Sequence, residues 1–169
     1  MTSIIIVLYA LCINLTNHLR LDQNAFFFTY MGVAAGLVFA NLGASYGTAK
    51  AGVGIASLGV IDSSKIFKSL IPIIFSGILG IYGVIVAVLL NAKAKDTKNM
   101  SDGYKFFGAG LCCGLSALAS GLAIGVAGDA GVRAYAQTDA IFVGMILIMI
   151  FAEAIGLYGM IVAIIMLSS

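Results

Sequence analysis

The chain has 169 residues, of which 62% are hydrophobic and only 9% are charged, and its formal net charge is +2. A soluble domain carries about 25% charged residues, so this composition excludes a soluble globular protein and indicates an integral membrane protein. The small net charge gives no sign of nucleic-acid binding. Twenty-one glycines and no tryptophan indicate closely packed helices without a tryptophan belt at the membrane surface.

Residues 1–25 form a separate N-terminal segment in this interpretation. Its apolar run from Ile4 to Ile13 is too short to cross a bilayer. The run also lacks the basic flank of a signal peptide. We expect a short helix here, distinct from the membrane-spanning part of the chain.

Four long uncharged stretches follow, and each is long enough for a transmembrane helix. We expect these helices over residues 26–56, 66–91, 103–134 and 140–167. Lipid leaves no alternative to helix, because open backbone groups would stay unsatisfied there. Short polar connections join the spans into two tandem helical hairpins, residues 26–91 and 103–167. Pro72 is expected to kink the second span, and Asp129 and Arg133 have the spacing of an ion pair at a helix end.

The first and third spans carry small residues at helical spacing. The two stripes are Gly32, Gly36, Ala40, Gly43, Gly47 and Ala51, and Gly110, Gly114, Ala117, Gly121, Gly125 and Gly128. Small residues let helix backbones approach closely in lipid. Two arrangements fit: an ordinary tight four-helix bundle, or a curved inner ring of glycine-rich helices with the bulkier second and fourth spans forming an outer wall.

The second half of the chain repeats the first half in a constant register. In this repeat alignment Ile81–Ala87 matches Leu157–Ala163, and no gap is needed from Phe28 to Met166. Each repeat is one hairpin. Glu153 aligns with Gly77, so only the second hairpin carries a carboxylate in its bulkier span. The asymmetry is typical of a duplicated unit that has lost one of two equivalent sites.

Glu153 is the only glutamate in the chain, and it lies in the middle of the last uncharged run. Its carboxyl is therefore expected near the bilayer midplane, where a charge costs at least about 2.5–3.5 kcal/mol. A group kept at this cost indicates a function, and the alternative is a neutral glutamate that only packs. Cys12, Cys112 and Cys113 have no metal-ligand spacing to the single histidine and are interpreted as packing residues.

Six segments of the chain resemble the proteolipid c subunits of eukaryotic V-type ATPases. They are Leu42–Lys50, Ser69–Ile73, Ile81–Gly83, Gly128–Arg133, Phe142–Ile148 and Ile150–Gly159, and the resemblance covers roughly residues 26–167. It implies an all-α membrane protein whose two hairpins assemble with identical or related subunits into a closed ring. In this family the glutamate at the position of Glu153 carries the proton. The N-terminal apolar run departs from the family's short polar tail, and we expect it to pack at the mouth of the ring.

The resemblance implies a rotor protein of the membrane V0 sector, which turns against the stationary a subunit while the d subunit and the central stalk bind its cytosolic face. Such a protein is not catalytic alone, needs no cofactor or metal, and resides in a vacuolar, lysosomal or endosomal membrane or in the plasma membrane. Burial in lipid favours the neutral form of Glu153, and a cation and water at the a subunit would favour its ionised form. The chain also lacks a Gly-x-x-x-x-Gly-Lys-Ser/Thr loop for nucleotide phosphates.

Few oxygen atoms are expected around Glu153, which favours protons over sodium as the transported ion. The second span offers only Ser76 and Tyr82 as polar side chains near the aligned Gly77. Tyr82 and Tyr158 are candidate hydrogen-bond partners of the carboxyl, and packing at the membrane interface is an equally open role for each of them. Ser76 is the third candidate for support of the carboxyl.

Two other functions compete with the rotor. An oligomeric four-helix channel or structural membrane protein would explain the spans and glycine stripes, but it leaves Glu153 and the asymmetric repeat without a reason. A secondary transporter with an intramembrane carboxylate is disfavoured because the repeat is parallel and not inverted.

Overall fold

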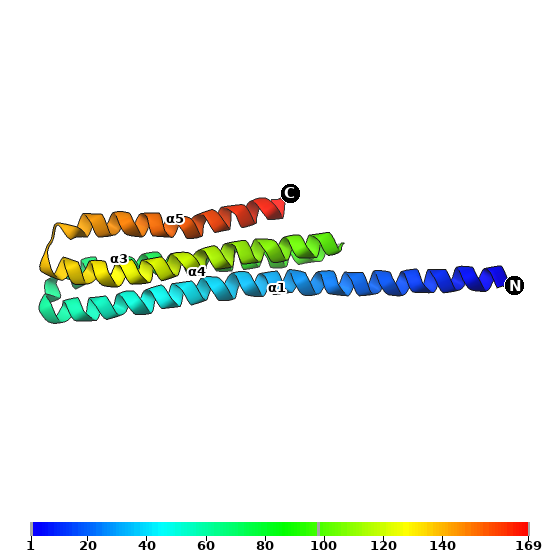
Figure 1. Cartoon of the computed structure of the whole chain (residues 1–169), viewed down its shortest axis with the longest axis horizontal. Coiled ribbons are helices and arrows are strands. Elements are labelled where there is room, and N and C mark those ends of the chain that lie inside the picture. Colours follow the sequence, from blue (N-terminus) through cyan, green and yellow to red (C-terminus); the bar gives the residue numbers. More distant parts are fainter. Residues whose placement is uncertain (1, 98, 169) are drawn as a thin grey trace.

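The computed structural model describes the backbone of residues 2–97 and 99–168, and the side chains of these residues from Gln23 onward. All regular structure in this part of the chain is helical (Figure 1). The long helices are α1 (Thr2–Ile61), α3 (Ile71–Lys93), α4 (Met100–Gln137) and α5 (Ile141–Ser168). The short ones are η1 (Ser63–Lys65), α2 (Ile66–Ser69) and η2 (Ala94–Asp96).

The four predicted spans are confirmed, and the first three segments are longer than the sequence pattern indicated. Four segments are long and apolar enough to cross a membrane: Gln23–Ile61, Ser63–Asp96, Met100–Gln137 and Ile141–Ser168. At the start of α4, the backbone N–H of Asn99 donates to the Asp102 carboxylate at 3.3 Å, half of a capping box.

The structure has one uninterrupted helix, α1, from Thr2 to Ile61, where the sequence pattern predicts a short helix within residues 1–25 and a separate span from residue 26. No glycine or proline occurs before Gly32, so no residue favours a helix break there. The N-terminal part of α1 extends beyond the other helices (Figure 1). The expected packing of the apolar run Ile4–Ile13 at the mouth of a ring lies outside the side chains that the structure describes.

The second span is divided into two helices close to Pro72, the residue that is expected from the sequence to kink it. A short helix, α2, ends at Ser69, and α3 begins at Ile71 with Pro72 in its first turn. Proline lacks the N–H that a helix interior needs, but the first turn leaves that donor free in any case. The backbone N–H of Ile74 then donates to the Leu70 carbonyl at 3.2 Å.

The helices form two layers, with α1 and α4 side by side and α3 and α5 packed against them (Figure 1). Glycines of α1 meet α4 in the same order along both helices, so the two helices are parallel. Gly32 lies against Phe106, Gly43 against Ala117, and Gly54 against Asp129. A Cβ added to Gly43 would lie 2.5 Å from the Ala117 carbonyl oxygen. The glycine stripes therefore let the two backbones touch, as predicted.

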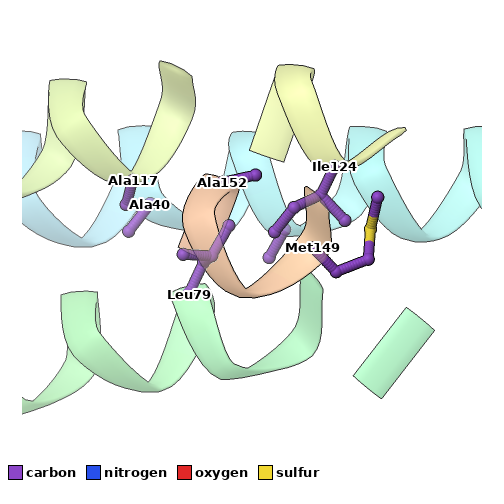
Figure 2. Packing of buried hydrophobic residues seen from close by; sticks show 7 residues of the cluster. Ala40, Leu79, Ala117, Ile124, Met149 and Ala152 are labelled. Carbon is purple, nitrogen blue, oxygen red and sulfur yellow. The ribbon is translucent and has the colours of Figure 1, made fainter. Parts of the chain in front are cut away.

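Apolar side chains from all four long helices meet in the middle of the bundle (Figure 2). This central cluster consists of Ala40, Ala44, Leu79, Ala117, Ile124, Met149 and Ala152. Phe75, Tyr82 and Ala127 pack against it. Ala152 belongs to this cluster, so the packing also holds the next residue of α5, Glu153, at a fixed height in the bundle.

Ion pairs gather at the end of the bundle where α1 and α4 terminate. The predicted pair is present, with 2.7 Å between Arg133 Nε and Asp129 Oδ1, and Lys50 Nζ lies 3.4 Å from the same carboxylate. Lys65 Nζ lies 2.8 Å from Asp139 Oδ1. In the connection after α1, the Ser64 hydroxyl donates to Asp62 at 2.6 Å and holds the pKa of that carboxyl below its usual value.

Candidate functional site

The site is built from one carboxyl on α5 and one phenol on α3. The Tyr82 hydroxyl donates to Glu153 Oε1 at 2.6 Å, a short distance typical of a charge-assisted bond. Both side chains are half-buried. Glu153 lies near the middle of α5, which spans Ile141–Ser168.

The packing of α5 sets the direction of Glu153. Ala152 faces the central cluster and is only 7% exposed. Successive residues of a helix differ by about 100° in direction, so Glu153 points away from α4 and reaches Tyr82 on α3. Tyr82 is itself held by packing against the central cluster.

The residues around the site on the outside of the bundle are apolar and exposed. Phe151 is 72% exposed, Ile155 47% and Ile81 56%. Exposed apolar side chains of this kind are what a membrane helix shows to lipid. Glu153 thus lies at the edge of the α3–α5 contact, next to the surface that lipid would cover.

The structure brings only one of the three predicted supporting residues to the carboxyl. Tyr158 is 62% exposed, and in the described residues it forms no hydrogen bond to Glu153. Ser76 is fully buried and donates to the Ala44 carbonyl at 2.8 Å, so its hydroxyl is used elsewhere. Tyr82 and Tyr158 are aligned positions of the repeat. Of these two tyrosines, only Tyr82 is hydrogen-bonded to the Glu153 carboxyl in the described structure.

Sequence reasoning missed Ser120 on α4. Its hydroxyl donates to the Ala152 carbonyl at 2.6 Å, and the side chain is fully buried. Ala152 immediately precedes Glu153. No sequence signal marked this residue, because a serine inside a small-residue stripe usually indicates only close packing.

The chemistry available here is the binding and release of one proton. Among the described side chains, only Tyr82 donates a hydrogen bond to Glu153. The same side chains contain no group of three or more His, Cys, Asp or Glu residues that could hold a metal ion. Tyr82 occupies Oε1, and Oε2 accepts no hydrogen bond from the described side chains.

Comparison with known proteins places the chain in a sequence family. The family described as the ATP synthase C subunit matches the chain twice, over residues 31–90 and 107–166. The two matches begin at residues 31 and 107 and end at residues 90 and 166, and both pairs are aligned positions of the internal repeat. Each match therefore covers one repeat.

Three relatives match most of the chain. The 16 kDa proteolipid c subunit of the V-type proton ATPase of Homo sapiens is 54% identical over 144 residues, which cover 85% of this chain and 93% of the human protein. The corresponding c 2 proteolipid of Caenorhabditis elegans is 53% identical, covering 83% and 89% of the two chains. The proteolipid of Ascaris suum is also 53% identical over the same shares. The chain therefore belongs to the family of the ATP synthase C subunit and, within it, to the proteolipid c subunits of V-type proton ATPases.

Proposed function

We propose that the chain is the proton-carrying rotor protein of a V-type ATPase membrane sector and that Glu153 is the proton carrier. The observation that carries this proposal is the single carboxyl near the middle of α5, hydrogen-bonded to Tyr82 and bordered by exposed apolar residues. The relatives named as proton ATPase subunits support it. ATP hydrolysis takes place in another sector of the complex, so the chain is not catalytic alone.

The physical chemistry of the carboxyl gives the cycle. While Glu153 faces lipid, desolvation favours its neutral form, and the protonated ring can turn. At the a subunit, a cation and a water path favour the ionised form and release the proton. The O–H of Tyr82 then stabilises the carboxylate by donating to Oε1. Rotation works against a membrane potential that costs about 2.3 kcal/mol per charge per 100 mV.

The internal repeat supports assembly into a ring. Five glycines of α1 face α4: Gly32, Gly36, Gly43, Gly47 and Gly54. Their aligned positions in the second repeat are Gly108, Cys112, Ala119, Ala123 and Ala130, which are small and half-buried or exposed on α4. The correspondence also holds in the other direction. Four glycines of α4 that face α1 align with exposed residues of α1: Gly110 with Ala34, Gly114 with Val38, Gly121 with Ser45, and Gly125 with Ala49. The free faces of α4 and α1 thus repeat the contact between α1 and α4, now between two copies.

Disulfide formation tests this contact between copies. Gly36 lies against Gly110, with 3.4 Å between an added Cβ at Gly36 and the Gly110 Cα. In the repeat alignment Gly110 matches Ala34, and Gly36 matches the native Cys112. The equivalent contact between two copies is therefore Ala34 of one copy against Cys112 of the next. We expect Ala34→Cys to form disulfide-linked oligomers under mild oxidation, because such backbones are close enough for a disulfide.

The control for this experiment is Ala35→Cys, which lies about 100° further round α1. It should give little cross-linking, and Cys112→Ser should remove the linkage in the Ala34→Cys protein. Equal oligomer ladders from both cysteine variants would contradict the proposed interface.

The ion is tested by protection of the carboxyl. A desolvated sodium ion needs several oxygen ligands, whereas the described side chains offer Glu153 only the Tyr82 hydroxyl. We expect the rate of carbodiimide modification of Glu153 to be the same in sodium and potassium salts at fixed pH and ionic strength. Slower modification in sodium alone would show that the chain binds sodium.

The partners follow from the same proposal. The ring contains copies of this chain and related c-type subunits, and its outer face meets the a subunit where Glu153 passes. The d subunit and the central stalk bind the cytosolic face. The ring lies in the membrane of a vacuolar, lysosomal or endosomal compartment or in the plasma membrane, and it acidifies the space on the other side.

A further inference from the structure

A buried serine hydroxyl joins the two helices of each hairpin. In the first hairpin, Ser76 of α3 donates to the Ala44 carbonyl of α1 at 2.8 Å. In the second, Ser120 of α4 donates to the Ala152 carbonyl of α5 at 2.6 Å. Both serines are fully buried.

The two bridges occupy equivalent places but run in opposite directions. In the repeat alignment, Ser120 matches Ala44, and Ala152 matches Ser76. The donor is on α3, the second helix of the first hairpin, and on α4, the first helix of the second hairpin. Each hairpin therefore has one hydroxyl bridge at this height, and only the second bridge ends next to a carboxylate.

Ser120 departs from the usual behaviour of a hydroxyl inside a helix. Thr48 and Ser57 donate to carbonyls four residues earlier in their own helix, Ala44 and Val53. Ser120 instead reaches across to another helix. In an apolar interior no water can replace this bond, so the hydroxyl fixes the height and rotation of α5 relative to α4.

The packing around the bridge allows no slack between the two helices. Gly156 lies one turn after Ala152, and a Cβ added there would be 2.5 Å from Leu79 Cδ2 and 3.4 Å from Ser120 Cβ. The close approach to α4 lies about one turn further on, where a Cβ added to Gly159 of α5 would be 2.8 Å from the Cys112 carbonyl oxygen of α4. Glycine at position 159 therefore lets the backbones of α5 and α4 come close beside the bridge. Rotation of α5 would move Glu153 away from Tyr82, since the carboxyl and the bridged carbonyl belong to adjacent residues.

We propose that Ser120 is a positioning residue for Glu153: its bond to the Ala152 carbonyl sets the rotation of α5 that holds the carboxyl against Tyr82. This inference rests on the proposed role of Glu153 in proton transport. It assigns to the Ser76 bridge of the first hairpin a structural role only, because that bridge lies beside Gly77.

The experiment compares three variants in the assembled ATPase. Ser120→Ala removes the bridge beside Glu153, and Ser76→Ala removes the equivalent bridge of the first hairpin. Ser120→Ala combined with Ala152→Ser copies the first hairpin's arrangement into the second, with the donor on α5 and the acceptor carbonyl on α4. ATP-driven proton transport is measured in vesicles and divided by the amount of assembled complex.

We expect Ser120→Ala to lower transport per complex by about threefold to tenfold, the range of one lost buried hydrogen bond. Ser76→Ala removes a bond of the same kind but should stay within about twofold of the parent protein, because its bridge positions no carboxyl. The double variant should recover at least half of the loss. Recovery in the double variant would show that transport depends on the hydrogen bond between the helices and not on a serine at position 120. This result separates positioning of α5 from simple packing.

Equal transport per complex in Ser120→Ala and Ser76→Ala would overturn the inference, and so would a double variant no better than Ser120→Ala. Glu153→Gln, measured in the same vesicles, distinguishes a failure of the positioning role from a failure of the proposed function. If Glu153→Gln abolishes transport while Ser120→Ala does not lower it, only the positioning role fails. If Glu153→Gln transports normally, the carrier assignment itself fails.

Discussion

Vesicles in which every copy of the chain carries Glu153→Gln are expected to show no ATP-driven acidification. Glutamine keeps the shape of the side chain and can still accept the Tyr82 hydrogen bond, so the ring should insert and assemble in normal amounts. An amide cannot bind and release a proton near neutral pH, so under the proposed function no proton can be carried by this side chain. The measurement is the rate of acidification per assembled complex.

The matched control is Glu153→Asp, which keeps an ionisable carboxyl but shortens the side chain by one methylene. The shorter side chain is drawn back from Tyr82 and should retain a fraction of the transport, whereas the amide retains none. Near-normal pumping by Glu153→Gln would mean that Glu153 only packs.

Gly43→Val is expected to prevent stable folding and assembly of the chain. An added Cβ at this position would lie 2.5 Å from the Ala117 carbonyl oxygen and 2.7 Å from the Leu118 Cα. Both atoms belong to the backbone of α4, so no side chain can move aside. Overpacking costs about 1–3 kcal/mol even where side chains adjust, and a tenfold loss of assembled complex corresponds to about 1.4 kcal/mol.

Gly77→Val is the matched control for this substitution. An added Cβ at Gly77 meets nothing within 4 Å, and the aligned position of the second hairpin holds the side chain of Glu153. We expect assembly and transport within about twofold of the parent chain. The amount of ring extracted in mild detergent measures both variants, and equal yields would show that the α1–α4 backbone contact is not essential.

Much of the fold follows from the sequence because lipid leaves few choices. Uncharged runs long enough to cross a bilayer must be helical, and the gapless internal repeat predicts two equivalent hairpins. The stripe containing Gly32 and Gly43 indicated a close helix contact, and the structure has this contact with α4. Periodicity could not predict that α1 begins at Thr2, because polar residues such as Asp22 weaken the apolar pattern without stopping a helix.

The details of the site depend on the relative height and rotation of helices, which the sequence does not encode locally. Tyr82 and Tyr158 are indistinguishable in the repeat, yet only Tyr82 meets Glu153 within the chain. Ser76 was a candidate partner by proximity along the second span, but its direction on α3 takes it to Ala44. Ser120 carried no signal, since its bond depends on how closely α4 approaches α5, a contact that the glycine at position 159 allows.

The most direct test of Glu153 as the proton carrier is to follow its covalent modification and proton transport together. Membranes are treated with a hydrophobic carbodiimide for increasing times, the modified residues are mapped by peptide mass spectrometry, and ATP-driven acidification is measured on the same samples. We expect modification at Glu153 and a loss of acidification that rises with it. Full modification of Glu153 with unchanged acidification, or loss of acidification while Glu153 stays unmodified, would contradict its role as the carrier.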